Sequence, residues 1–115
     1  SLNFHVGNQL KKAKKIFPSW GIAGSATEKG WEGPDAKLVE TETKGIWTIK
    51  NMALKTGEFK FRFNDDWTLN FGKDMSDGIV PQGNNIEILS GVYDIILDIT
   101  DYEKPKYEIL SSPNA

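Results

Sequence analysis

Alternation of apolar and charged side chains in the stretch GEFKFRFN, residues 57–64, constrains the fold more than any other feature. Phe59, Phe61 and Phe63 alternate with Lys60 and Arg62. Successive side chains of a β-strand point to opposite faces of the sheet. The stretch is therefore predicted to be a strand with its phenylalanines in the core and its two cations on the outer face.

A period of two residues recurs along most of the chain, and Gly, Asn, Asp and Pro separate the alternating stretches. Strands are predicted at residues 20–25, 36–41, 45–50, 57–64, 67–72, 84–89, 91–99 and 105–110. Many short strands at this spacing predict an all-β fold. We expect an antiparallel β-sandwich, immunoglobulin-like or carbohydrate-binding-module-like, of about seven or eight strands.

The inward-facing residues of these strands are sufficient for a sandwich interior. A chain of 115 residues has the length of one domain, which buries about two thirds of its unfolded surface. The predicted core residues are Phe59, Phe61, Phe63, Trp47, Tyr93, Ile95 and Leu97.

The first residues depart from the pattern. The segment NQLKKAKKI has four lysines in five positions and could form a short basic helix, which is marginal by itself in water. We predict a linker or the remnant of a preceding domain over residues 1–16, and the sandwich domain over 17–112. His5 has no nearby second ligand and is interpreted as incidental. Because the chain starts at Ser1, it is predicted to be a piece of a longer protein.

Composition excludes several classes of function. A formal charge of -2 and a pI near 5.4 argue against a nucleic-acid partner, which requires clustered Lys and Arg. Without cysteine the chain has no disulfide, thiol nucleophile or thiolate zinc site. No apolar run approaches the roughly 20 residues of a membrane helix, so the fragment is expected to be soluble.

Enzyme chemistry finds no support in the motifs. There is no G-x-S-x-G, no P-loop and no histidine partner for a nucleophile, and the carboxylates are spread over turns and outer strand faces. Asp65, Asp66, Asp74 and Asp77 could in principle bind calcium, but their spacing matches no EF-hand loop and Asp favours turns for backbone reasons. We expect no catalysis, no metal site and no cofactor.

Two tryptophans need a separate explanation, because Trp31 and Trp67 lie in predicted loops among polar residues. Each could fold back and cap an open end of the sandwich. The two together are better explained as a shared exposed platform, because loops lie on the surface and often carry function. Exposed, coplanar rings on one face would favour the platform over the structural role.

The chain from Trp20 to Leu110 also resembles a known family. The motifs WGIAGSAT, FKFRFNDDW and GNNI are similar to those of the repeated β-sandwich domains of SusE/SusF-type outer-membrane lipoproteins, which bind starch and other glycans. The same order is similar to the glycogen-binding domain of the AMP-activated kinase β subunit. The resemblance implies a glycan site formed by Trp31, Lys60, Trp67 and the pair Asn84 and Asn85.

This resemblance implies non-catalytic capture of an oligosaccharide or polysaccharide, with α-glucan favoured, at the outer face of the outer membrane. The parent protein would be anchored by a lipid outside this fragment and would act with other glycan-uptake components. The alternative is a structural spacer or protein-contact domain of a surface lipoprotein without glycan affinity of its own.

Overall fold

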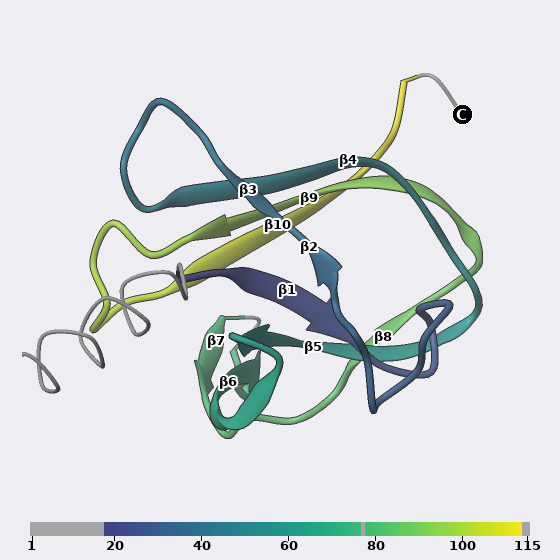
Figure 1. The fold of residues 1–115 in the computed structure, drawn as a ribbon, viewed down its shortest axis with the longest axis horizontal. Coiled ribbons are helices and arrows are strands. Elements are labelled where there is room, and N and C mark those ends of the chain that lie inside the picture. The colour runs from purple at the N-terminus through teal and green to yellow at the C-terminus, as the bar shows by residue number, and fades with distance from the viewer. Residues whose placement is uncertain (1–17, 77, 114–115) are drawn as a thin grey trace, which may run out of the picture.

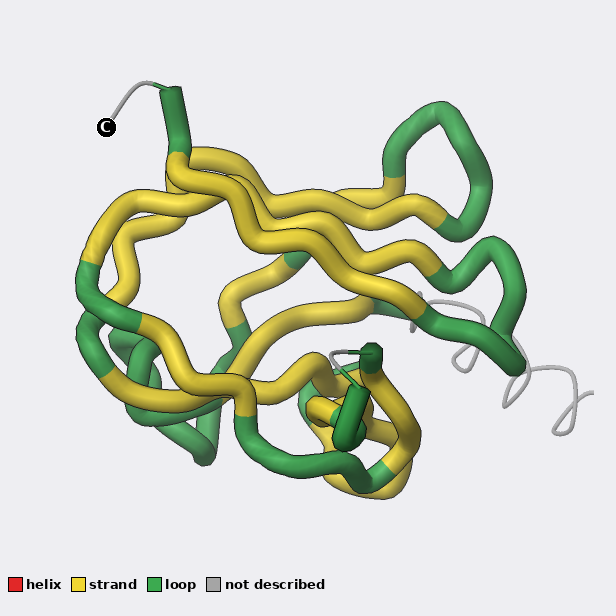
Figure 2. The backbone as a smooth tube through the Cα atoms, turned by 180° about the vertical axis from the view of Figure 1, so that it is seen from behind, coloured by secondary structure: helices red, strands yellow, loops and turns green. Residues whose placement is uncertain are grey.

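The computed structural model describes residues 18–76 and 78–113, and this part of the chain consists of strands and loops (Figure 1, Figure 2). The strands form two antiparallel sheets that pack as a β-sandwich, which confirms the predicted fold class. The predicted segment 1–16, with His5, and Asp77 lie outside the described residues. Within the described ranges there is no helix that could cross a membrane.

The first sheet has the strand order β2-β1-β5-β6-β7, and β8 pairs with the free part of β5. Its strands are β1 (Trp20–Ala23), β2 (Ala36–Lys37), β5 (Gly57–Phe63), β6 (Asp66–Lys73), β7 (Ile79–Pro81) and β8 (Ile86–Ile88). Because β6 covers one half of the edge of β5 and β8 covers the other half, β5 is the central strand of this sheet.

The second sheet has the order β10-β9-β4-β3, with β3 (Val39–Glu40), β4 (Ile46–Leu54), β9 (Gly91–Asp98) and β10 (Lys106–Ser111). Figure 1 shows it as the upper layer, and the turns from β4 to β5 and from β8 to β9 cross between the layers at the same end. These connections place both halves of the sandwich against one core.

Two strand predictions need correction. The single strand predicted at 36–41 is divided between the sheets, because buried Leu38 donates its N–H to the Trp20 carbonyl at 2.9 Å while β3 already pairs with β4. Strand β7 was missed because three residues are too few to show a period. The described residues contain ten strands rather than seven or eight.

The core prediction is confirmed for Phe59, Phe61, Ile95 and Leu97, which are all fully buried. Phe63, Trp47 and Tyr93 are only partly buried and pack against the margin of the core, because their strands end or bend there. Trp20 completes the interior by stacking on Phe71, with ring centroids 5.0 Å apart.

Strand β5 has the two faces that its alternation predicts. Phe61 lies opposite Ile22 of β1 in the core, whereas Lys60 and Arg62 lie opposite Ala23 and Gly21 on the outer face. The short side chains of β1 leave room above the sheet there, and the candidate site occupies this room.

Candidate functional site

Trp67 is aimed by a tight turn and a bulge. Asn64 and Asp65 connect β5 to β6 with φ of 51° and 56°, the two left-handed residues that a type I′ hairpin requires. After the pair Phe63 and Asp66 the register resumes only at Arg62 and Asn70, so residues 67–69 bulge out of the ladder. Such an irregularity re-aims a side chain. It explains why a large aromatic follows this strand.

Trp31 lies in a closed loop between β1 and β2. Gly24 and Gly30 form an isolated bridge, and the Thr27 hydroxyl donates to the Gly24 carbonyl at 2.8 Å. Gly30 has φ of 68°, which turns the chain back toward the sheet. Trp31 follows directly and is half-buried on the outer face of the first sheet.

The structure brings Trp31 and Trp67 into contact, and we call them the indole pair. Their ring centroids are 5.8 Å apart and their planes meet at 44°. Trp67 is 38% exposed. The rings are not coplanar and Trp31 is only half-exposed, so the arrangement that would favour a platform over a structural role is not met. The two indoles form an angled surface on one face of the sheet.

Arg62 lies beneath the indole pair and is only 2% exposed. Its Nε donates to both carboxylate oxygens of Asp35, at 3.0 and 2.9 Å, and Nη2 pairs with the same carboxylate. Its guanidinium carbon lies 4.5 Å from the centroid of the Trp67 ring, a cation–π distance. The hydrogen bond with Asp35 raises the pKa of Arg62. A permanent buried cation thus supports the site.

Lys60 lies two residues before Arg62 on the same outer face. Its Nζ is 5.9 Å from the centroid of the Trp67 ring, and partial burial lowers its pKa. An ammonium has three donors and no acceptor. Lys60 therefore places hydrogen-bond donors at the border of the indole pair, where a polar ligand could accept hydrogen bonds from them.

Neither predicted asparagine is hydrogen-bonded to the indole pair or to Lys60 in the described ranges. The β5–β8 pairing ends at Phe59 and Ile86, one residue short of Lys60 and Asn85. The Asn85 amide donates to Glu58 Oε1 at 3.3 Å, on the same face. Asn84 pairs through its backbone with Lys73, and in the described ranges no hydrogen bond of Asn84 reaches the indole pair or Lys60.

Sequence reasoning missed the residues that support the indole pair. Alternation predicts that Arg62 faces outward but does not reveal that a loop covers it. Asp35 lies 27 positions from Arg62, and Asn70 follows an irregular register that no period predicts. The sequence carries no signal for these contacts. In the structure Gly33 makes room for Arg62, because a Cβ there would lie 2.7 Å from Arg62 Nη2.

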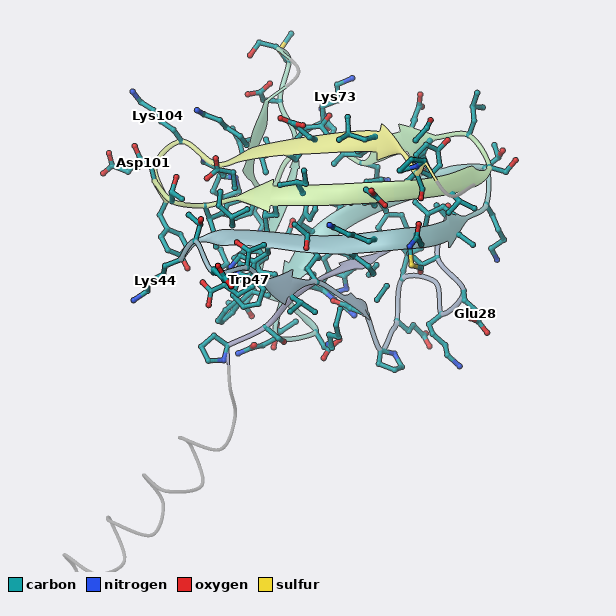
Figure 3. The ribbon with its side chains drawn as sticks, turned by 90° about the horizontal axis from the view of Figure 1, so that it is seen from above. Glu28, Lys44, Trp47, Lys73, Asp101 and Lys104 are labelled. Atoms are coloured by element: carbon teal, nitrogen blue, oxygen red, sulfur yellow. The ribbon has the colours of Figure 1, made fainter. Side chains whose placement is uncertain are left out.

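Other parts of the described chain have fewer side chains that are arranged for binding or catalysis. A hollow of about 600 Å³ lies between Trp47, Lys44 and Tyr102, at the end of the sandwich opposite Glu28 (Figure 3). No aromatic contact joins Trp47 to Tyr102 in the described chain. Asp66 and Asp74 accept backbone N–H groups within their turns. Apart from residues 1–17, 77, 114 and 115, no group of acids or histidine is suited to a metal.

Comparisons of the chain with protein-family models, with curated proteins and with solved structures gave no match. The functional argument therefore depends on the geometry of the indole pair and its polar neighbours.

Proposed function

We propose that this domain binds a glycan non-covalently through the indole pair, without catalysis, in the manner of a SusE/SusF-type domain. The observation that carries the proposal is the contact between two partly exposed indoles with an ammonium at their border. A sugar ring has an apolar face of C–H groups surrounded by hydroxyls. The indoles suit the face, and Lys60 with the Asn85 amide suits the hydroxyls.

The tilt of the indole pair favours an α-linked glucan as the ligand. In an α-1,4 chain each sugar is turned relative to the preceding one, so the chain curves. In a β-1,4 chain the rings are nearly coplanar and the chain is flat. Two indole planes at 44° offer faces to successive rings of a curved chain. The proposal extends to glycan capture at the outer-membrane surface by a lipid-anchored parent protein.

Affinity at this surface should be modest, because the open indole pair removes only part of each sugar from water. A ligand also loses conformational freedom on binding. We expect a dissociation constant on the order of 0.1–1 mM, equivalent to about 4–5.5 kcal/mol. Tandem domains in a parent protein would raise the overall affinity by increasing the effective concentration.

Isothermal titration with maltooligosaccharides tests the proposal, with cellooligosaccharides as the flat comparison. Trp31→Ala should abolish the heat of binding. Tyr102→Ala is the matched control, because Tyr102 is an exposed aromatic that has no contact with the indole pair. If the wild-type domain binds no glycan at millimolar concentrations, the proposed function is wrong.

The alternative of a structural or protein-contact domain has two observations in its favour, the lack of coplanar rings and the position of Trp67 over buried Arg62. In that role Trp67 shields a cation from water and needs no ligand. The two functions differ in their consequences for Trp31, since removal of Trp31 would then affect stability but have no binding to abolish.

A further inference from the structure

Arg62 contacts both segments that carry the indole pair. Its Nη1 donates to the Trp31 carbonyl at 3.3 Å and its Nη2 to the Glu32 carbonyl at 3.2 Å. Its guanidinium carbon also lies 4.5 Å from the centroid of the Trp67 ring. One side chain thus fixes the backbone at Trp31 and supports the ring of Trp67.

Asn70 complements this arrangement from the neighbouring strand. It lies directly opposite Arg62 in the β5–β6 register and is fully buried. Its Nδ2 donates to the Trp67 carbonyl at 2.8 Å, which closes the bulge. The cross-strand pair of Arg62 and Asn70 therefore holds the main-chain carbonyls of both tryptophans.

We propose that Arg62 is a positioning residue that fixes the angle of the indole pair and so selects curved glucan chains over flat ones. This inference rests on the proposed function. Arg62 is covered by the loop and by Trp67, so it acts on a ligand only through the two rings. The angle is set because the carboxylate of Asp35 holds the guanidinium in one orientation.

Lysine cannot replace arginine in this role, although it preserves the charge. A guanidinium is planar and has five donors in a fixed geometry, whereas an ammonium is a compact charge with no flat face. A lysine at position 62 could keep an ion pair with Asp35 but could not also serve two carbonyls and a ring. The variant Arg62→Lys therefore separates charge from geometry.

The experiment compares wild type, Arg62→Lys and Arg62→Met. Circular dichroism of two indoles in contact shows an exciton couplet whose amplitude depends on their mutual angle. We expect both variants to weaken the couplet and to lose at least about tenfold in affinity for maltooligosaccharides, about 1.4 kcal/mol. The ratio of the affinity for maltooligosaccharides to that for cellooligosaccharides should fall toward one.

Leu97→Ala is the control for destabilisation, since Leu97 is fully buried in the second sheet and far from the outer face of the first. Measured below its unfolding temperature, it should keep both the couplet and the affinity of wild type. Arg62→Lys with wild-type couplet and wild-type preference would overturn the inference. A wild-type domain that binds no glycan overturns the proposed function instead, and the couplet alone then decides whether Arg62 sets the angle.

Discussion

Both faces of strand β5 contain buried residues, but different physical interactions stabilise them. On the inner face Phe59 and Phe61 contact each other and the core, with ring centroids 5.7 Å apart. On the outer face Arg62 is almost equally inaccessible, yet each of its contacts is polar or cation–π. Removal of apolar surface from water stabilises the inner face, and this hydrophobic contribution has no preferred direction.

The contacts on the outer face depend instead on how the charged and hydrogen-bonding groups are oriented. A buried cation is tolerated only when its charge is paired and its donors are satisfied. Asp35 and the carbonyls of the Trp31 loop meet this requirement for Arg62. One strand thus supplies hydrophobic stability on one face and a fixed arrangement of polar and aromatic groups on the other. Variants on each face should therefore have different effects on stability and binding.

The largest effect is expected from Phe61→Ala on the inner face. Removal of a fully buried ring leaves a cavity and should lower the free energy of unfolding by about 3–5 kcal/mol. Urea denaturation measures the loss, and Phe63→Ala at the margin of the core should lose less. Where Phe61→Ala is still folded, glycan affinity should stay near wild type. A loss below about 1 kcal/mol would mean that the faces of β5 are reversed.

Asp35→Asn tests the outer face and should have the next largest effect on stability. The amide keeps the shape of the carboxylate but leaves Arg62 buried without a counter-charge. The cost should be about 3 kcal/mol, the lower end of the range for a broken buried ion pair, because the amide oxygen still accepts a hydrogen bond. Because the guanidinium loses its fixed orientation, affinity for maltooligosaccharides should fall as well. Exposed Asp101→Asn is the control. If Asp35→Asn lowers the stability but leaves the affinity for maltooligosaccharides unchanged, the orientation of Arg62 does not contribute to binding.

Trp67→Ala should have a smaller effect on stability and a larger one on binding. The indole shields Arg62, so its loss should cost about 1–2 kcal/mol, the range of a partly desolvated cation–π contact. Glycan binding should disappear, as measured by titration calorimetry. A loss of stability as large as that of Phe61→Ala, with no glycan affinity in the wild type, would make Trp67 a structural lid.

The smallest expected effect concerns Asp65, in the turn before Trp67. Partial burial opposes its ionisation, but hydrogen bonds from Lys37 and from the Asp35 N–H outweigh burial and lower its pKa. A lowered pKa in the folded state stabilises the protein above the usual Asp pKa, and this contribution is lost as the pH falls through the folded pKa.

Denaturation midpoints between about pH 6 and pH 3 should therefore fall less steeply for Asp65→Asn than for wild type. The pKa values of Asp66, Asp74 and Asp98 are also lowered, by hydrogen bonds within their own turns. They contribute equally to both proteins, so the difference between the two curves isolates Asp65. Parallel curves would show that the bond to Lys37 has no effect on stability.

The sequence by itself determined most of the strands, the fold class and which residues of β5 face the core. It could do so because the alternation is local and strands such as β5 show it clearly. The resemblance to SusE/SusF-type domains pointed to Trp31, Lys60 and Trp67, and the structure brings these three together. The residues Asn64 and Asp65 likewise indicate a turn, because Asn and Asp tolerate the left-handed backbone conformation.

The tertiary structure alone decided how the two tryptophans meet. Their rings meet at 44° beside a bulge at 67–69, and no periodicity encodes such an insertion. Burial of Arg62 depends on Asp35 and on the Trp31 loop, which are brought to it by the pairing of β2 with β1 and of β1 with β5. Local patterns specify which way a side chain points, whereas its neighbours depend on contacts between residues distant in the sequence.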